Sequence, residues 1–441
     1  MQRSKMLLTS LKRSVTPTIL ALTALCILTA CQSQIRSARD SFPQGTGGIN
    51  ASHQQDKPYL ILISIDAFRW DYMDRYPTPN LDRIADAGSR AERLLPVFPT
   101  LTFPNHYSIA TGLYPANHGI VANTFPDPAS GRWYNMKDRS AVEDSYFYGG
   151  EPIWVTAETQ GMVSASFFFV GSEAPIRGVQ PTHWRRYDGD IPGEARVDQV
   201  LAWLAQPRET RPHMITLYFD NVDSHSHWYG PDSQETAAAI RRVDGYIGRL
   251  LDGLQELAHG NQVNIVLVSD HGQRGYLENT PPFVLGEYVY TGDAPLVGGG
   301  SYLFIHLGSE ELHKADDYAT TINRHWEHGK AYTRDNAPAD WHVTGNPRFP
   351  DLIFIPEPGH AVIPVAGAKS LAGDHGWAPE DPAMHGFFVA SGPNIKPGVQ
   401  LGAVEMVDVY PLMLAILGLE GPATSDGDAA VLSGILRPGA D

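Results

Sequence analysis

The chain has 441 residues, 42% of them hydrophobic, which is sufficient for one large α/β domain or two smaller ones. Its formal net charge of −16 at pH 7 argues against a general nucleic-acid-binding surface. A small anionic substrate is still compatible with this charge, because bound metals reverse the charge locally. The only cysteines are Cys26 and Cys31, so we expect any metal to be held by histidine and carboxylate ligands.

Residues 1–30 have the layout of an export signal. Basic residues precede an apolar run at about 19–28, which is too short for a comfortable membrane span. The run ends in "LTAC", and small residues before Cys31 resemble a bacterial lipobox, which implies cleavage before Cys31 and acylation of that residue. Gln32 follows, so in a Gram-negative host we expect an outer-membrane lipoprotein. The alternative is an ordinary signal peptide with a chance cysteine.

Residues 31–57 are polar, contain glycine and serine, and show no apolar period. This composition predicts a flexible tether between Cys31 and a folded domain over 58–435. Loss of the signal removes four basic residues and changes the net charge from −16 to −20 (−16 − 4).

From residue 58 onward, apolar runs alternate with helical patterns, which predicts an α/β fold with a mostly parallel sheet and helices on both faces. The region 276–371 is less regular and predicts an inserted α+β subdomain or cap. The predicted strands are 59–66, 162–170, 213–220, 263–270 and 387–393, with 301–307 and 351–359 in the insert. The predicted helices are 79–88, 106–111, 151–161, 192–206, about 233–258 and 406–419, with one near 311–328 in the insert.

A stretch at 97–123, "VFPTLTFPNHYSIATGLYPANHGIVAN", places threonines between two prolines just before a possible helix. A threonine there can be a plain N-cap, which bonds free backbone N–H groups. It can instead be a nucleophile placed where those N–H groups receive an anion. The stretch alone does not decide between Thr100 and Thr102, or between the two roles.

Three buried strands end in aspartate or lead to it. The strand 59–66 ends at Asp66, the chain after 213–220 reaches Asp223, and the strand 263–270 ends at Asp270. Ligands of open α/β sheets bind beyond the carboxyl ends of the strands, so we expect these side chains to converge. A single strand-end aspartate commonly caps the next turn, but three crowded carboxylates repel one another and require cations.

Histidines accompany these aspartates. His227 lies four residues after Asp223, His271 directly follows Asp270, and His375 precedes the last strand. Aspartate and histidine ligands without cysteine suit zinc, or manganese in its place. Two metals bridged by aspartate, about 4 Å apart, suit phosphoryl transfer. Spacing alone does not set aside the competing ligand candidates His106, His118, His225, His360 and His385.

Five motifs occur in order along the chain: "ISIDAFRWDY", "PTLTFPNHYSIATGLYPANHGIVAN", "DNVDSHSHWYGP", "LVSDHG" and "GDHGW". Over roughly 58–420 they resemble the nucleotide pyrophosphatase/phosphodiesterase family of the alkaline phosphatase superfamily. The resemblance implies an alkaline phosphatase-like fold and an enzyme with two zinc ions. It also implies hydrolysis of phosphodiester or phosphoanhydride bonds of nucleotides through a covalent phospho-threonine.

The resemblance assigns a role to individual residues. It matches the nucleophile to Thr102, and the asparagine that binds the phosphoryl oxygen to Asn123. With these, the backbone N–H of Phe103 is expected to bind developing charge. Phe103 and Tyr187 resemble the aromatic pair that sandwiches a nucleobase. Leu101 departs from the family pattern, since many vertebrate members have lysine there, and this leaves the substrate preference open.

The resemblance also divides the metal ligands into two sites. Both are implied by matched motifs and not by geometry. One zinc ion, which also touches Thr102, is expected at Asp66, Asp270 and His271. The other, which faces the attacking water, is expected at Asp223, His227 and His375.

Other functions are weighed against this one. A choline-phosphodiester or lysophospholipid hydrolase of the same family is not separated by the motifs. A phosphomonoesterase commonly needs arginine to hold further phosphoryl oxygens, so the neutral Asn123 favours diesters. "TFPNH" lacks the C/S-x-P-x-R pattern of sulfatases. A metal-binding surface lipoprotein without activity is disfavoured by the intact threonine and six matched ligands. The oligomeric state is left open.

Overall fold

The computed structural model describes residues 48–367 and 371–438. The predicted signal peptide, the predicted lipidation site Cys31 and most of the predicted tether lie outside the described residues. Within them, no helix combines the length and the apolar character that crossing a bilayer requires.

The end of the predicted tether is attached to the folded domain. Asn50 is 1% exposed, and its side-chain nitrogen donates to the carbonyl oxygens of Arg208 at 3.1 Å and Arg211 at 2.8 Å. Its Oδ1 accepts from the N–H of Val163 at 2.7 Å. The domain therefore starts by residue 50 and not at the predicted residue 58. Because polar hydrogen bonds hold this segment to the domain, its polar composition did not predict the attachment.

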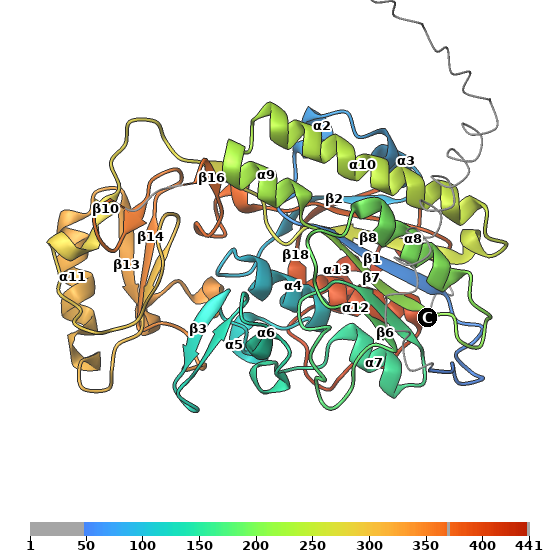
Figure 1. The fold of residues 1–441 in the computed structure, drawn as a ribbon, viewed down its shortest axis with the longest axis horizontal. Helices are drawn as coiled ribbons and strands as arrows, with labels where there is room; N and C mark the ends of the chain where they lie inside the picture. The colour runs from blue at the N-terminus through green and yellow to red at the C-terminus, as the bar shows by residue number, and fades with distance from the viewer. Residues whose placement is uncertain (1–47, 368–370, 439–441) are drawn as a thin grey trace, which may run out of the picture. The chain divides into compact units, whose positions relative to one another are not determined.

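One eight-stranded sheet forms the centre of the domain (Figure 1). Strand β17 is antiparallel to both of its neighbours, and all other neighbouring pairs in this sheet are parallel. The predicted α/β class with a mostly parallel sheet is confirmed. In order across the sheet the strands are β18 (Val399–Glu405), β2 (Ser89–Leu95), β17 (Phe388–Ser391), β8 (Val263–Val268), β1 (Tyr59–Ile65), β7 (Met214–Phe219), β5 (Ser164–Phe167) and β6 (His183–Trp184).

Strand β1 shows why the central strands are apolar throughout and do not alternate. Leu60 and Leu62 belong to the core on one face of the sheet, whereas Ile61 and Ile63 belong to the core on the other face. Each face is covered by helices (Figure 1), so both sets of side chains are buried. Helices α3 (Pro79–Asp86), α8 (Gly193–Leu204) and α10 (Gln234–Gln255) cover the isoleucine face, and α4 (Thr102–Thr111), α7 (Ile153–Thr159) and α12 (Val409–Leu417) cover the leucine face.

Helix α10 illustrates how the sequence specifies these covering helices. It begins after Ser233, whose side-chain oxygen accepts from the N–H of Thr236 and so caps the helix. Apolar residues three or four positions apart form one buried stripe against the sheet. These residues are Ile240, Val243, Ile247, Leu250 and Leu254.

The region predicted as an insert contains a second, four-stranded antiparallel sheet, which lies to one side of the central sheet in Figure 1. Helix α11 (Ala315–His325) packs on it, and the two share a separate apolar core that includes Leu303, Ile322 and Phe354. The sheet order is β11 (Leu296–Gly298), β12 (Leu303–Ile305), β14 (Leu352–Pro356) and β13 (Gly329–Thr333).

Several elements were not predicted, some because their sequences are polar and others because they are too short or too exposed to show an apolar period. Strands β2 ("SRAERLL") and β18 ("VQLGAVE") bury few apolar side chains, and helix α9 (Asn221–Tyr229) contains "DSHSH". The other short elements are α2 (Tyr72–Arg75), α5 (Pro115–His118), α6 (Arg139–Val142), α13 (Ala429–Ser433), β3 (Thr124–Asp127), β4 (Arg132–Asn135), β9 (Arg274–Gly275), β10 (Phe283–Val284), β15 (Val362–Ile363) and β16 (Gly373–Asp374).

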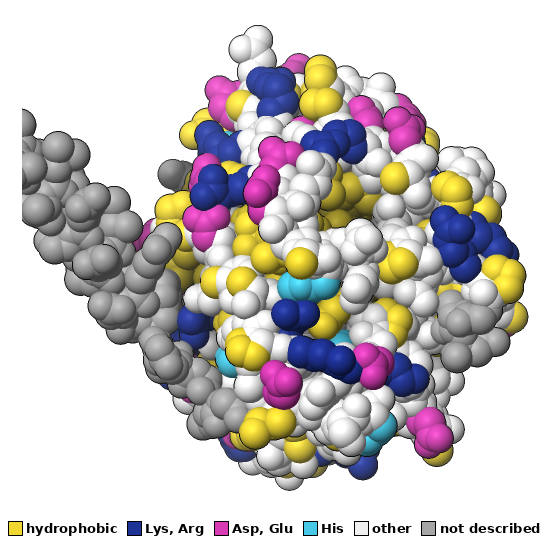
Figure 2. Space-filling view, turned by 90° about the vertical axis from the view of Figure 1, so that its right-hand side faces the viewer, with side chains coloured by type: hydrophobic (Ala, Val, Ile, Leu, Met, Phe, Trp, Pro, Cys, Tyr) yellow, Lys and Arg dark blue, Asp and Glu magenta, His cyan; other side chains and the backbone are white. Residues whose placement is uncertain are grey.

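Charged side chains of both signs are mixed on the face that Figure 2 shows. Lysine and arginine lie there in small groups, with acidic and apolar side chains between them. This pattern differs from the clustered basic face that is typical of nucleic-acid-binding domains.

Candidate metal and active site

Three neighbouring strands, β8, β1 and β7, bring the predicted aspartates to one edge of the sheet. Their order across the sheet and their parallel pairing, with Ser64 opposite Val268 and Ile65 opposite Phe219, place their carboxyl ends together. Asp66 follows β1 directly, and Asp270 comes two residues after β8. Asp223 lies in the first turn of α9, which begins right after β7.

The first cluster contains Asp66, Asp270 and His271, whose side chains are at most 2% exposed. His271 Nε2 lies 3.0 Å from Asp270 Oδ2 and 3.6 Å from Asp66 Oδ1. Thr102 Oγ1 lies 3.3 Å from the same His271 nitrogen. The four residues that the resemblance assigned to one metal site are therefore within reach of a common point.

The two aspartates of this cluster show that it fits a cation. Asp66 Oδ2 accepts from the Tyr218 hydroxyl at 2.5 Å, and Asp270 Oδ1 accepts from the N–H of Ala67 at 3.1 Å. The other oxygens, Asp66 Oδ1 and Asp270 Oδ2, are buried without a hydrogen-bond partner among the described residues. Buried carboxylate oxygens without partners are costly, and a metal ion bound between them removes that cost.

The pKa values of the two carboxyls reflect the same crowding. Burial, together with repulsion from Asp270 and Asp223, raises the pKa of Asp66 well above its ordinary value. Burial also opposes ionisation of Asp270, but His271 and His106 outweigh it and hold the pKa of Asp270 well below its ordinary value. A cation between the two carboxylates would favour the ionised form of both.

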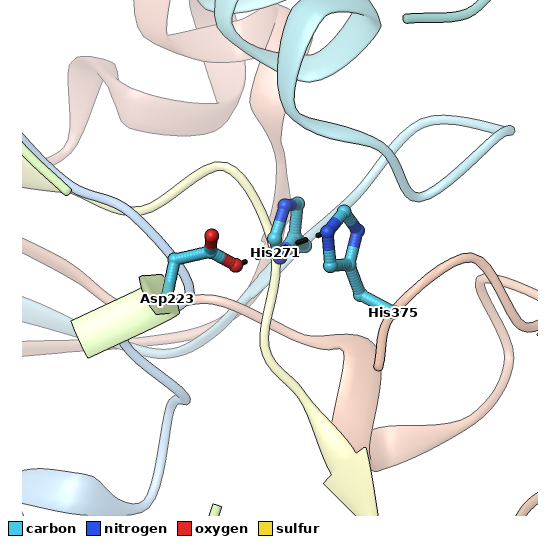
Figure 3. Close-up of side chains that lie close together, drawn as sticks. All are labelled: Asp223, His271 and His375. Atoms are coloured by element: carbon cyan, nitrogen blue, oxygen red, sulfur yellow. Dashed lines mark ion pairs between the residues drawn. The ribbon is translucent and has the colours of Figure 1, made fainter. Parts of the chain in front are cut away.

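The second cluster contains Asp223, His227 and His375. Asp223 and His227 are four residues apart on α9, with His227 Nε2 3.2 Å from Asp223 Oδ1. His375 Nε2 lies 3.8 Å from the same oxygen. Figure 3 shows Asp223, His271 and His375 pointing toward one another, and the rings of His271 and His375 stack with centroids 3.6 Å apart. The two clusters are thus direct neighbours.

Backbone carbonyl groups orient all three histidines. Nδ1 of His271 lies 3.0 Å from the oxygen of Gly272, Nδ1 of His227 lies 2.9 Å from that of Gly373, and Nδ1 of His375 lies 2.8 Å from that of Thr100. A carbonyl oxygen can only accept, so each Nδ1 carries the proton. When such a ring is neutral, the lone pair of its Nε2 points to the cluster, and this is the form that binds a metal.

Thr102 is the first residue of α4 and is not its N-cap. The N-cap position is occupied by Leu101 in an extended conformation, and no side chain caps the helix. Asn105 holds the preceding loop, since its Nδ2 donates to the carbonyl oxygens of Pro99 at 2.9 Å and Leu101 at 2.8 Å. The Thr100 hydroxyl donates to the carbonyl oxygen of Trp377 at 2.8 Å. The plain N-cap interpretation of Thr102 is therefore wrong, and its hydroxyl faces the first cluster.

Asn123 is connected to the start of α4. The backbone N–H of Phe103 donates to Asn123 Oδ1 at 2.9 Å. The N–H of Phe103, which was predicted to donate to the phosphoryl group, therefore donates to Asn123 in this structure. The bond fixes the side-chain amide so that its Nδ2 is the group left to donate.

A hollow of about 440 Å³ opens beside the clusters. Phe103 and Tyr187, the predicted aromatic pair, both line it, together with Thr102, Asp66 and Asp223. Tyr187 is 40% exposed, so its ring is accessible to a ligand. The wall also contains residues that the sequence did not indicate, among them Lys137, Arg139 and Glu173.

Sequence reasoning missed three other residues at the clusters. Tyr218 bonds Asp66, and Gln273 Nε2 donates to Asp223 Oδ1 at 2.6 Å. Asp374 lies within ligand distance of His227 and His375, although its Oδ2 accepts from the Tyr276 hydroxyl. Only Asp374 had a sequence signal, its position next to His375 in "GDHGW".

The five competing histidines have different surroundings. His106 lies behind the first cluster, with Nδ1 3.2 Å from Asp270 Oδ2 and Nε2 2.8 Å from the Ser64 hydroxyl. His360 belongs to a separate group described below. His118, His225 and His385 contact Ser108 Oγ, the oxygen of Asn221 and the oxygen of Pro379, respectively, and join none of the clusters.

Comparison with known sequences adds an independent observation. A family model described as type I phosphodiesterase / nucleotide pyrophosphatase matches residues 60–378. Human ectonucleotide pyrophosphatase/phosphodiesterase family member 1 is 34% identical over 401 residues, which are 87% of this chain and 42% of the human protein. An uncharacterized pyrophosphatase/phosphodiesterase of Schizosaccharomyces pombe is 32% identical over 392 residues, 86% of this chain and 80% of the yeast protein. The chain thus spans less than half of its human relative.

Solved structures of pyrophosphatase / phosphodiesterase proteins are also similar to this chain. Murine ectonucleotide pyrophosphatase / phosphodiesterase 5 superposes with a TM-score of 0.81 and 27% identity, covering 86% of this chain and 100% of the murine chain. An inactive threonine-to-alanine variant of the same murine protein, in complex with AMP, gives the same TM-score and identity over 87% of this chain and 100% of that one.

Proposed function

The chain belongs to the type I phosphodiesterase / nucleotide pyrophosphatase family, and from this membership we propose that it hydrolyses phosphodiester or phosphoanhydride bonds of nucleotides at Thr102. The observation that carries the proposal is the approach of Thr102 Oγ1 to His271 Nε2, at 3.3 Å, since this nitrogen also lies within 3.6 Å of the carboxylates of Asp66 and Asp270. The Thr102 hydroxyl makes no helix-capping bond, and the cluster that it faces contains buried carboxylate oxygens without hydrogen-bond partners among the described residues. These surroundings support a role for Thr102 as the nucleophile.

Two zinc ions are proposed as the cofactor. Asp66, Asp270, His271 and the Thr102 hydroxyl would hold one ion. The oxygen and imidazole donors, without cysteine, suit zinc or manganese. When bound, zinc would lower the pKa of the Thr102 hydroxyl and neutralise charge on the phosphoryl group. Asp223, His227 and His375 would hold the second ion.

The residues of the chain perform a two-step displacement. Thr102 loses its hydroxyl proton to solvent, and its Oγ forms a bond to phosphorus as the bond from phosphorus to the leaving oxygen breaks. The leaving group is released, and the product is a phospho-threonine that keeps the remaining ester of the nucleotide. Water then attacks phosphorus, breaks the bond to Oγ and regenerates Thr102. In both steps Asn123 Nδ2 donates a hydrogen bond to a non-bridging phosphoryl oxygen, because its Oδ1 is held by the N–H of Phe103.

A nucleotide is the substrate class that the adjacent hollow supports best. Phe103 and Tyr187 offer two aromatic side chains in its wall, beside Thr102. Lys137, also in the wall and exposed, is available to pair with the phosphate of a nucleotide, in a wall that also contains the acidic Glu173 and Asp220. The murine relative in complex with AMP supports the same choice.

Hydrolysis assays with p-nitrophenyl thymidine monophosphate and p-nitrophenyl phosphate, with and without chelator, test this function. We expect the diester to be hydrolysed faster than the monoester and chelator to stop both reactions. A second panel compares ATP, a dinucleotide and glycerophosphocholine. Preference for glycerophosphocholine would overturn the nucleotide assignment, and preference for the monoester would overturn the diesterase assignment.

We also propose that the protein is anchored to a membrane through lipidated Cys31, in the outer membrane of a Gram-negative host. The support is the "LTAC" sequence after an apolar run. Mass spectrometry of the mature N-terminus is expected to find a lipid-modified cysteine. Cys31→Ser should release or mislocalise the protein and leave the turnover of the catalytic domain unchanged. A mature N-terminus that starts elsewhere and carries no lipid would contradict the anchor.

A further inference from the structure

The inserted subdomain contains a further cluster of histidine and carboxylate side chains, formed by His328, Glu357 and His360. One ligand atom from each of these residues lies within 4.8 Å of the others, and none of the three belongs to the catalytic clusters. We propose that they form a third divalent-metal site, of the zinc class, which stabilises the subdomain and takes no part in the hydrolysis. Neither the family match nor the motifs that carry the catalytic ligands point to this site.

The fold brings the three side chains together. Strands β13 and β14 are antiparallel, and their last pair is Gly329 opposite Pro356. His328 and Glu357 are the next residues beyond this pair, and the N–H of Glu357 donates to the oxygen of His328 at 3.0 Å. The hydrogen-bonded register therefore continues for one more position and places the two side chains side by side, with His328 Nδ1 3.2 Å from Glu357 Oε2.

A tight turn adds the third ligand. The N–H of His360 donates to the oxygen of Glu357 at 2.9 Å, and Gly359 has a φ of +84°. A Cβ at this glycine would lie 2.9 Å from Leu277 Cγ, so both the conformation and the space favour glycine. The turn brings the rings of His328 and His360 into a stack with centroids 4.2 Å apart.

The backbone that carries these ligands is tied to the core of the domain. The carbonyl oxygen of His360 accepts from Trp377 Nε1 at 3.2 Å, and Trp377 is 0% exposed. The side chains themselves are free to adjust, since those of His328 and Glu357 are 50% and 57% exposed. A fixed backbone with adjustable side chains suits a metal, because zinc bonds of about 2.0–2.2 Å require the ligand atoms to close to roughly 3.3 Å.

The surroundings favour a cation. A hollow of about 210 Å³ adjoins the cluster and is lined by His328 and His360. Three further potential ligands, Glu287, His325 and Glu327, also line it, and the described residues of its lining include no lysine or arginine. Two imidazoles and one carboxylate with room for water match the His₂Glu donor set that binds zinc with an open position.

A metal here would act as a clip between distant parts of the chain. It would join His328, the residue before β13, to the turn after β14. The carbonyl oxygen of His360 in this turn accepts from Trp377, which is two residues from His375. The expected effect is greater resistance of the subdomain to unfolding. Turnover should not change, because no residue of the clip lines the hollow that contains Thr102.

Equilibrium dialysis of the purified protein against zinc, followed by elemental analysis, tests the site. We expect His328→Ala/His360→Ala to bind one zinc ion fewer per chain than the wild type, with a lower melting temperature in zinc and unchanged turnover. The matched control is His313→Ala, an exposed histidine of the same subdomain that belongs to no cluster; it should keep the full count.

The difference between variant and wild type does not depend on how many ions the catalytic clusters bind, so failure of the proposed hydrolase would not be mistaken for failure of this site. Equal zinc counts in the wild type and the double variant would overturn the proposal. An equal loss in His313→Ala would do the same, since it would show non-specific binding to surface histidines. An anomalous difference peak at the zinc edge beside Glu357 in crystals would support it directly.

Discussion

Thr102 and Thr100 lie two residues apart but have opposite surroundings. The Thr102 hydroxyl faces His271 and caps nothing, whereas the Thr100 hydroxyl bonds the buried carbonyl oxygen of Trp377. We expect Thr102→Ala to lose nearly all turnover, with its zinc content kept and its free energy of unfolding changed by less than about 1 kcal/mol. Thr102→Ser should keep part of the activity, because the hydroxyl survives without the rotamer restriction of the methyl group.

Thr100→Ala is the matched control and should show the reverse pattern. Loss of a buried hydrogen bond is expected to cost about 1–3 kcal/mol of stability and leave most of the turnover. Urea unfolding and the diester assay measure the two quantities. The nucleophile assignment fails if Thr102→Ala, with normal zinc, hydrolyses p-nitrophenyl thymidine monophosphate at a near wild-type rate.

Asn123 can be tested through the two halves of its amide. Asn123→Ala removes both the acceptor for the N–H of Phe103 and the donor Nδ2, and should lower kcat roughly 10²–10³-fold. Asn123→Asp keeps an acceptor for Phe103 but replaces the donor by a charge that repels the phosphoryl group. We therefore expect an equal or larger loss in kcat from Asn123→Asp. If Asn123→Asp retained wild-type kcat, the amide would only position α4 and would not bind the phosphoryl oxygen.

The candidate site was predictable where a ligand type follows a recognisable strand or motif. Asp66 and Asp270 follow apolar strands, His271 directly follows an aspartate, and His227 lies four residues after one. The sequence alone therefore indicated them as candidate ligands. Tyr218 was not predictable, because a tyrosine in an apolar strand has no signal that its hydroxyl bonds Asp66. The carbonyl groups that orient the histidines could not be predicted either, since any residue can supply a backbone oxygen.

At the scale of elements, helices α4 and α5 are joined by a buried histidine that must be neutral. His118 Nδ1 accepts from the N–H of Ile120 at 3.1 Å, so Nε2 carries the proton and donates to Ser108 Oγ at 3.0 Å. A second proton on Nδ1 would face a donor. Burial lowers the pKa of His118 from 6.5 to about 3.

This depressed pKa sets a direction for the pH dependence of stability. In the unfolded state His118 binds a proton below about pH 6.5, whereas in the folded state it does so only below about pH 3. The free energy of unfolding therefore falls as the pH drops through this window. The slope from His118 is at most about 1.4 kcal/mol per pH unit. His118→Gln keeps a donor and cannot titrate. Urea unfolding of metal-free protein at several pH values from 7 to 5 should give a shallower slope for the variant, and identical slopes would contradict the assignment.

The elements also show which parts of a fold can be read from a sequence. The buried strands β1 and β7 were predicted within one residue at each end, whereas the predicted ends of β5 and β8 extended up to three residues too far. Strand β18 was missed because it lies at the sheet edge and most of its side chains are exposed. Helix α9 was missed because its polar sequence serves the second metal cluster and not the core.

For the whole molecule, metal removal should lower stability as well as stop turnover. The domain places three carboxylates, Asp66, Asp223 and Asp270, near one another at the edge of its central sheet, and repulsion from the other two already contributes to the raised pKa of Asp66. An ion at 100 to 1,000 times its Kd contributes about 3–4 kcal/mol. Calorimetry at pH 8 should therefore show a lower Tm after chelation, restored by zinc.

Thr102→Ala provides the control for that experiment, since it keeps six of the proposed ligands and should respond to chelator much as the wild type does. The double variant His328→Ala/His360→Ala separates the contribution of the subdomain cluster from that of the catalytic ions. A melting temperature that is the same with and without chelator would mean that the carboxylates need no cation.

The position of β17 has a consequence for how the chain reaches its native state. Strand β2, near the start of the domain, joins the rest of the central sheet through β17, which is almost 300 residues later in the sequence (388 − 95 = 293). During synthesis, β8 therefore has no partner on one side until nearly the whole chain has been made. Contacts between such distant segments form late and slow the completion of folding. If the signal peptide proposed above directs export, this order would favour it, because the central sheet stays incomplete until most of the chain has been made.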